Sequence, residues 1–307
     1  MGKKLKKFKD VDHVAASLES ADYICSKTIA TVVFLAQATQ KPVLVEGPAG
    51  VGKTELSKAV ARSLERELIR LQCYEGLDET KALYEWEYAK QLLYTQMMKE
   101  KINDVVSGAQ NLPEAVDRIA AQEDAFFSER FIQPRPLLQA ISSAKPVVLL
   151  VDEVDKSDPE FEAFLLEVLS DFQVSIPELG TQVARNIPFV FLTSNDSRDM
   201  SDALKRRGIH LYIDYPERDL EMKIVKLKIP RINDRLTGQL IDTIRKIRGL
   251  DLKKKPCISE TLDWAHSLIA LQVEDLSPEV LTDTLNVILK YRADVEQVKG
   301  KIDKILN

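Results

Sequence analysis

The sequence predicts an α/β domain built on a parallel sheet, followed by a smaller all-α domain. Apolar runs at residues 43–45, 146–151 and 188–193 have the composition of buried strands, and helical patterns separate them. A glycine-rich segment joins the first run to a helix. No convincing strand follows residue 215. Continuous apolar runs between helices are typical of parallel strands, because helices then cover both faces of the sheet.

Composition places the chain among ordinary globular proteins. Its 307 residues suffice for one large or two modest domains, and they are 45% hydrophobic and 30% charged. The net charge of −5 argues against a general attraction to nucleic acid or anionic membranes, although a local basic patch remains open. The longest apolar runs, residues 29–38 and 146–151, are too short to cross a bilayer.

Two further features indicate a cytoplasmic protein. The basic start, residues 3–9, lacks the apolar core that a signal peptide needs. Cys25, Cys73 and Cys257 lie far apart without the spacing of a metal site, which suggests reduced thiols.

The elements of the first domain follow from hydrophobic periodicity. Residues 1–20 are charged and weakly patterned, and residues 73–139 change character, with aromatic and charged residues, two helical segments and a loop at residues 103–113. A hairpin is expected at residues 172–185. The five expected strands are 43–45, 68–72, 146–151, 188–193 and 211–213, and the main expected helices are 23–39, 55–67 and 161–169.

The second domain is expected to contain helices alone. We place the boundary at residue 215, so that residues 1–215 form the α/β domain, with an insert at about 73–140, and residues 216–307 the all-α domain. Ser259 and Ser277 have the residue type and position of helix N-caps. The expected helices are 218–228, 232–247, 260–271, 278–291 and 292–306.

Residues 47–54 form the motif G-x-x-x-x-G-K-[ST], which is typical of a phosphate-binding loop. The glycines allow a tight turn whose N–H groups point toward a phosphate, and the following helix adds the positive end of its dipole. Lys53 would reach the β- and γ-phosphates of ATP, and the Thr54 hydroxyl would bind Mg²⁺. An ordinary glycine-rich turn is the alternative. The candidate nucleotide-binding residues are Gly47, Pro48, Ala49, Gly50, Val51, Gly52, Lys53, Thr54 and Glu55.

Hydrolysis needs more than a phosphate cradle, because phosphoryl transfer depends on charge neutralisation and on a positioned nucleophile. Asp152 and Glu153 follow an apolar strand that would deliver them beside the loop. We expect Asp152 to hold Mg²⁺ and Glu153 to polarise the attacking water. Asn195 follows the next strand, and its amide would orient water or contact the γ-phosphate. The alternative for Asp152 and Glu153 is a solvated strand end, and the alternative for Asn195 is an ordinary turn residue.

Two arginines are candidates for the stabilisation of phosphoryl charge. They lie in the segment Lys205-Arg206-Arg207-Gly208, after a short helical stretch. A guanidinium can act on its own subunit or on a neighbouring one. The assignment is ambiguous by one position, so Arg206 and Arg207 both remain candidates, and Arg207 is preferred. For Lys205 we expect only a solvated side chain.

Taken together, these motifs resemble the AAA+ ATPases. Residues 47–54 match Walker A of that family, residues 147–153 match Walker B, and residues 193–195 match sensor 1. Residues 203–207 resemble its arginine-finger segment. The resemblance implies a P-loop AAA+ core with a parallel five-stranded sheet, and an all-α lid.

Other segments resemble the MoxR branch of that family. They are the long insert between residues 72 and 146, the segment 131–138 and the hairpin 172–185 that precedes sensor 1. Three segments within the insert are similar to the CoxD-type subgroup, namely 73–78, 82–86 and 90–94.

The lid departs from the family pattern. Residues 258–262 offer no sensor 2 arginine, so we assign no lid residue to catalysis. Tyr23 and Ile24 lie where such proteins usually line the adenine pocket, and plain helix packing is the alternative for both.

The resemblance implies a homo-oligomeric ring, usually a hexamer, with ATP and Mg²⁺ at the subunit interfaces. It further implies a chaperone with a von Willebrand factor A-domain partner and a metalloenzyme client that receives a cofactor. We therefore expect an ATP-hydrolysing chaperone that remodels a protein client. The two alternatives are a DNA-acting motor and a nucleotide-gated scaffold with little hydrolysis. The net negative charge argues weakly against the DNA-acting motor.

Overall fold

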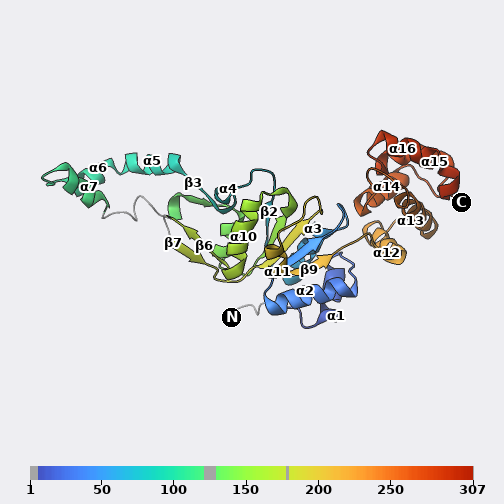
Figure 1. The fold of residues 1–307 in the computed structure, drawn as a ribbon, viewed down its shortest axis with the longest axis horizontal. Coiled ribbons are helices and arrows are strands. Elements are labelled where there is room, and N and C mark those ends of the chain that lie inside the picture. Colours follow the sequence, from blue (N-terminus) through green and yellow to red (C-terminus); the bar gives the residue numbers. More distant parts are fainter. Residues whose placement is uncertain (1–5, 121–128, 178–179, 307) are drawn as a thin grey trace.

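The computed structural model describes residues 6–120, 129–177 and 180–306 of the chain. Along the chain, an α/β body is followed by a group of helices, and a thin arm extends from the opposite side of the body (Figure 1). The predicted five-stranded parallel sheet between helices is confirmed. No helix of these described ranges combines the length and the apolar character that a bilayer-spanning helix needs.

Five parallel strands form the central sheet: β1 (Val43–Glu46), β2 (Leu68–Gln72), β5 (Val148–Asp152), β8 (Phe189–Ser194) and β9 (Ile209–Tyr212). Their order is β2-β5-β8-β1-β9. The register aligns Gln72 with Asp152, and Glu46 with Ser194. The carboxyl ends of the strands therefore meet along one edge, where the polar residues that follow the strands come together.

Helices cover both faces of this sheet, because successive strand side chains point to opposite faces. Val43 and Val45 belong to one hydrophobic cluster, and Leu44 between them belongs to another. The first cluster includes residues of α1 (Val11–Ser20), α2 (Lys27–Thr39) and α3 (Lys53–Leu64). The second includes residues of α9 (Pro136–Ser142), α10 (Pro159–Asp171) and α11 (Asp202–Arg207). The body is a three-layer sandwich.

In the first helical layer, one helix was missed and two predicted helices were wrong in their boundaries. Helix α1 was not predicted, and Asp10 caps it by accepting a hydrogen bond from the backbone of His13. Helix α2 begins at Lys27 rather than at residue 23, because Ser26 accepts the Ile29 N–H as its N-cap. Helix α3 ends at Leu64 rather than at residue 67, since the next residue adopts a left-handed conformation.

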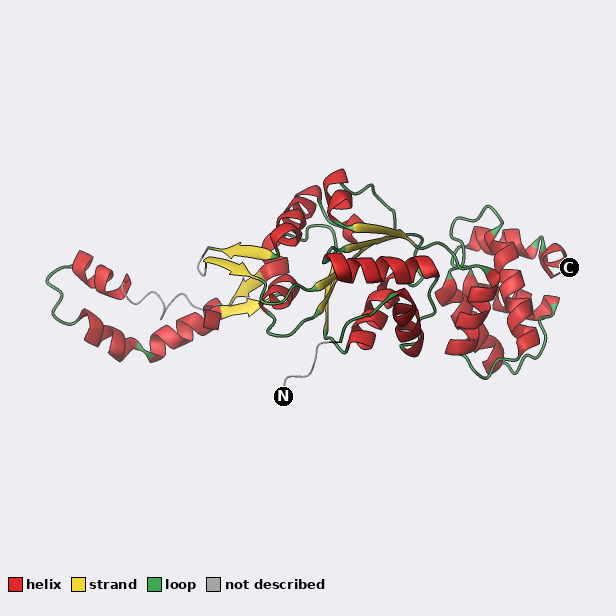
Figure 2. Cartoon of the chain, turned by 90° about the horizontal axis from the view of Figure 1, so that it is seen from below, coloured by secondary structure: helices red, strands yellow, loops and turns green. Residues whose placement is uncertain are grey.

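The insert between β2 and β5 contains α4 (Glu79–Leu83), β3 (Tyr84–Trp86), α5 (Tyr88–Met97), α6 (Lys99–Val106), α7 (Leu112–Ala120), a 3-10 turn (Glu129–Phe131), β4 (Ile132–Pro134) and α9. Strands β3 and β4 pair antiparallel. Helices α5, α6 and α7 extend beyond this pair as an arm (Figures 1 and 2). The predicted loop at 103–113 was too long, because α6 continues to Val106 and α7 begins at Leu112.

The predicted hairpin is confirmed as the antiparallel pair β6 (Gln173–Ile176) and β7 (Gly180–Val183). Residues 178–179 of its expected turn lie outside the described residues. The hairpin follows α10, and it lies on the same side of the body as the arm (Figure 2).

The C-terminal helices are α12 (Arg218–Lys228), α13 (Asp234–Arg248), α14 (Ile258–Ala270), α15 (Pro278–Ile288), α16 (Arg292–Lys299) and α17 (Ile302–Leu306). They share a hydrophobic cluster of their own, in which Trp264 is fully buried. Ser277 caps α15 as predicted, but Cys257 rather than Ser259 caps α14. The helix predicted at 292–306 is interrupted at Gly300. The boundary at residue 215 stays a prediction.

Candidate active site

The glycine-rich loop connects β1 to α3 at the carboxyl edge of the sheet. Gly47, Gly50 and Gly52 have positive φ values of 143°, 74° and 100°, which side chains other than glycine rarely adopt. A Cβ at Gly47 would lie 2.0 Å from the carbonyl oxygen of Ile213, and one at Gly50 would lie 2.0 Å from Sγ of Cys257. The loop is therefore enclosed by the chain after β9 and by the N-cap of α14.

Lys53 is buried at the start of α3 and turns its ammonium toward the inside of the loop. Its Nζ donates to the carbonyl oxygens of Gly47 and Pro48, each at 2.7 Å, and to Oδ1 of Asn195 at 2.8 Å. Burial lowers the pKa of Lys53, and nearby carboxylates, first that of Asp155, oppose this effect. The ammonium lies where the phosphate-binding lysine of such a loop is needed.

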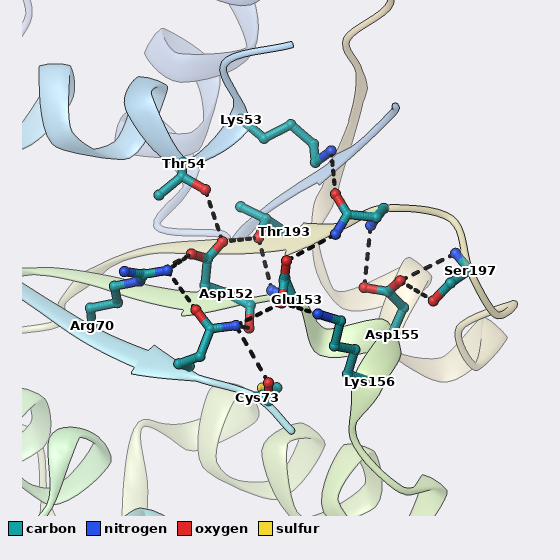
Figure 3. Close-up of polar contacts among 12 residues, drawn as sticks. Lys53, Thr54, Arg70, Cys73, Asp152, Glu153, Asp155, Lys156, Thr193 and Ser197 are labelled. Carbon is teal, nitrogen blue, oxygen red and sulfur yellow. Dashed lines mark hydrogen bonds and ion pairs between the residues drawn. The ribbon is translucent and has the colours of Figure 1, made fainter. Parts of the chain in front are cut away.

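The side chains of Thr54 and Asp152 meet near that lysine (Figure 3). The Thr54 hydroxyl donates to Oδ1 of Asp152 at 3.0 Å, and Thr193 donates to the same oxygen. Asp152 is buried at the end of β5. Hydroxyl and carboxylate oxygens are the ligands that Mg²⁺ prefers, so this donor set fits the metal that the sequence predicts.

Glu153 directly follows Asp152, and its φ of 59° turns the chain sharply after β5. Its backbone N–H donates to the Thr193 hydroxyl at 3.0 Å. One carboxylate oxygen, Oε1, accepts from Asn195 Nδ2 at 3.1 Å. The other, Oε2, accepts from Gln72 at 2.8 Å and from Lys156 at 2.5 Å. The carboxylate that we expect to polarise water is thus held by groups from three sides (Figure 3).

Asn195 bridges the lysine and the glutamate. Its Oδ1 accepts from Lys53 and its Nδ2 donates to Glu153. Its backbone N–H donates to Asp155 at 3.2 Å, and Ser197 donates to the same carboxylate. Burial alone would raise the pKa of Asp155, but these donors lower it below its ordinary value, so Asp155 stays ionised and fixes the Asn195 loop.

Sequence reasoning missed Arg70, Gln72 and Asp155. Arg70 contacts Oδ2 of Asp152 through Nε at 3.0 Å and through a terminal nitrogen at 2.5 Å. Arg70 and Gln72 are alternate residues of β2, so their side chains share a face, and the parallel pairing with β5 brings them to the two carboxylates. Polar residues at alternate positions of an otherwise apolar strand were the available signal.

Replacement of Arg70 is expected to have a measurable effect on metal affinity. Its guanidinium is half exposed and neutralises part of the charge of Asp152. In the Arg70→Gln variant we expect the nucleotide complex to bind Mn²⁺ about three-fold more tightly, because a like charge near the cation is removed. Paramagnetic resonance of Mn²⁺ in the presence of ADP measures this affinity. Lys58→Gln, which removes a charge elsewhere on the body, is the control, and an unchanged or weaker affinity in Arg70→Gln would contradict the role.

Arg206 and Arg207 are not part of this cluster. Both are exposed at the C-terminal end of α11, beside the edge strand β9. Within the described part of the chain, neither makes a hydrogen bond or ion pair with the residues around Lys53 or Glu153. The role of either arginine at a neighbouring subunit therefore stays a prediction.

A pocket of about 520 Å³ lies beside the loop, between the body and the C-terminal helices. Tyr23 and Ile24 line it, in the segment before α2 rather than in the helix itself. Tyr23 packs near Gly52, and its burial raises the pKa of its hydroxyl. Other lining residues are Val51, Ile213, Tyr215, Leu220, Ile224, Ile258 and Leu262. An apolar pocket next to a phosphate-binding loop would suit a nucleotide base, and the adenine-binding role of Tyr23 and Ile24 stays a prediction.

The body matches a known family model. The model is described as "AAA domain (dynein-related subfamily)", and it matches residues 42–208. This range includes the loop, both carboxylates, Asn195 and the two arginines, and it covers more than half of the chain.

Characterised relatives are distant. The chain is 24% identical over 277 residues to the gas vesicle ATPase GvpN of Haloferax mediterranei, covering 86% of this chain and 73% of the relative. It is 24% identical over 165 residues to the chaperone protein ClpB of Bacillus anthracis, covering 53% of this chain and 15% of the relative. A solved chain, the RuvB Holliday junction branch migration motor of Thermotoga maritima, aligns at a TM-score of 0.48 and 16% identity, covering 91% of this chain and 72% of that one.

Proposed function

This chain belongs to the dynein-related, MoxR-like family of AAA domains, and from that premise we propose that it hydrolyses ATP to remodel a protein client. Its P-loop AAA+ fold implies that it binds a nucleotide, typically with Mg²⁺. Similarity to GvpN agrees with the predicted MoxR type. The narrower CoxD-type assignment stays a prediction.

One observation supports hydrolysis most directly. Polar side chains from three segments far apart in the sequence meet at one edge of the sheet: Lys53 and Thr54, Asp152 and Glu153, and Asn195. A structural role alone would not require a buried ammonium, a hydroxyl–carboxylate pair and a second oriented carboxylate within one hydrogen-bonded network. This combination supplies the parts that phosphoryl transfer to water needs.

Each side chain has a task in this proposal. Bound Mg²⁺ would neutralise charge on the β- and γ-phosphates, and Thr54 and Asp152 would hold it. Lys53 would bind the same phosphates from inside the loop. Glu153 would accept a hydrogen bond from the attacking water and polarise it, while Asn195 would keep that carboxylate and the water in line.

The arm suggests how a protein client is engaged. Helix α5 buries none of its residues, and Tyr88 and Met97 are about three-quarters exposed, at 73% and 75%. Exposed apolar side chains of this kind are typical of protein-binding surfaces. We extend to this chain the ATPase activity in the name of GvpN and the chaperone activity in the name of ClpB.

The finer points of the proposal rest on family resemblance. We propose a homo-oligomer, most simply a hexamer, in the cytoplasm, with a von Willebrand factor A-domain partner. We propose a metalloenzyme as the client, matured by cofactor insertion. The pocket at Tyr23 and Ile24 would take the adenine base.

The experiment that tests this function is ATP turnover by the purified chain over a range of protein concentrations. We expect turnover per subunit to rise steeply with concentration, because an arginine from a neighbour must complete each site. Flat and negligible turnover would instead favour the nucleotide-gated scaffold. Stimulation by duplex DNA, together with salt-dependent DNA binding, would overturn the protein client in favour of a DNA motor.

A further inference from the structure

A second pocket lies at the opposite end of the sheet from the nucleotide loop. Its volume is about 180 Å³. Its walls come from segments that precede strands: Lys41 before β1, Arg66 before β2, Pro146 before β5 and Pro188 before β8. Helix α3 spans the distance between the two sites, and its 12 residues correspond to about 18 Å.

The lining of this pocket is positively charged. Lys7, Lys41 and Arg66 contribute three cations, and none of the residues that line the pocket is an aspartate or a glutamate. Within the described ranges, none of the three forms an ion pair with a carboxylate, although the neighbouring Lys6 pairs with Glu65. Lys7 and Lys41 are exposed, so the three charges gather around one small volume without a carboxylate partner among the described residues.

Arg66 lines this pocket, and its side chain carries a hydrogen-bonding group without a partner. Its Nε is the one buried side-chain nitrogen or oxygen in the described part of the chain that lacks a hydrogen-bond partner. Burial lowers the pKa of Arg66, and no neighbouring carboxylate opposes the effect. An unpaired buried donor is costly, more so on a charged group, so an anion that binds beside the Arg66 guanidinium would offset part of this cost.

The walls that carry these cations are fixed. The segment with Lys7 is tied to α2 by two hydrogen bonds, from Phe8 N–H to Gln37 at 2.9 Å and from Gln37 back to the Phe8 carbonyl at 3.0 Å. Asn186, on the opposite wall, donates to the Ser143 carbonyl at 3.3 Å. The Gln37 and Asn186 amides already have protein partners, which leaves the cations and the Gln40 amide as the side-chain groups available to a ligand.

We propose that this pocket binds a small oxyanion, a phosphate or a carboxylate group, between Arg66, Lys41 and Lys7. A guanidinium and ammonium groups pair readily with either group. The volume suits one such group and is about a third of that of the pocket beside the nucleotide loop. The proposal is independent of ATP hydrolysis, because no residue of this pocket belongs to the hydrolytic cluster.

The test is thermal unfolding of the full chain, saturated with ADP and Mg²⁺ so that the phosphate-binding loop is occupied. Sodium phosphate and sodium acetate are titrated separately against sodium chloride of equal ionic strength. We expect one of the two oxyanions to raise the unfolding midpoint by about 3 °C at a ten-fold excess over its Kd. A shift with phosphate identifies a phosphate site, and a shift with acetate alone identifies a carboxylate site.

Variants of the lining residues test whether the oxyanion binds in this pocket. In Arg66→Gln we expect the oxyanion shift to disappear, while Arg62→Gln, which removes an equal charge from α3 outside the pocket, keeps it. Lys41→Gln, at an exposed position, should reduce the shift even if Arg66→Gln proves unstable. Shifts no larger than those in chloride, or equal shifts in parent and pocket variants, would overturn the proposal.

Discussion

Replacement of Glu153 by glutamine is expected to leave ATP binding intact and to lower turnover by about 10²- to 10⁴-fold. The new amide side chain keeps an acceptor for the Asn195 amide, so the loop that contacts Lys53 should retain its geometry. The negative charge that polarises water is lost, and with it the driving force for removal of the water proton. Binding should be unchanged because Lys53, Thr54 and Asp152 are untouched.

Turnover is measured by phosphate release, and affinity by titration with a fluorescent ATP analogue. Glu160→Gln, an exposed position on α10, is the matched control and should behave like the parent. Parental turnover in Glu153→Gln would show that another group activates the water. A variant that neither binds nor hydrolyses ATP would mean instead that Glu153 holds the structure of the site.

The second large effect concerns the arginines at the end of α11. If Arg207 completes the site of a neighbouring subunit, Arg207→Ala should lose about 10³-fold or more of its turnover, in the range known for arginine fingers. Arg206→Ala should then lose little. The reverse pattern would assign the role to Arg206, and both arginines remain candidates because both are exposed.

An experiment that mixes two variants shows whether Arg207 acts on a neighbouring subunit or within its own chain. Glu153→Gln subunits lack the water-polarising carboxylate but carry both arginines, and Arg207→Ala subunits carry the carboxylate. In one mixed oligomer, each Glu153→Gln subunit would complete the site of an Arg207→Ala neighbour, so two inactive preparations should together regain turnover. Failure to regain turnover, while a mixed oligomer forms, would contradict the assignment of Arg207 to a neighbour's site.

Much of the fold followed from local pattern. Continuous apolar runs predicted strands β1, β5 and β8, because a strand covered on both faces requires apolar residues at every position. Helix ends were harder to predict. The start of α2 depends on one hydrogen bond to Ser26, and the interruption at Gly300 separates two helices that one amphipathic pattern had joined. Helix α1 was not predicted, because its many charged residues leave only a short apolar pattern, the buried face at Val14 and Leu18.

Within the site, the residues with a sequence motif were the ones that could be named in advance. Lys53, Thr54, Asp152, Glu153 and Asn195 each stand at a strand end or in a recognisable loop, and each hydrogen-bonds with another of the five. The contacts that Arg70, Gln72 and Asp155 make with these five have no motif, and only the alternate polar residues of β2 offered a weaker signal. Each depends on which strands become neighbours, and no local pattern encodes that choice.

The sequence alone determined that a phosphate-binding loop, two carboxylates and an amide lie at strand ends, because each is set by a few adjacent residues. The tertiary structure decided which groups hold them. Parallel pairing of β2 with β5 brings Arg70 to Asp152 across 82 positions of sequence and Gln72 to Glu153 across 81. The same packing leaves Arg66 with a buried, unpartnered donor, since burial is a property of the assembled layers and not of any residue type.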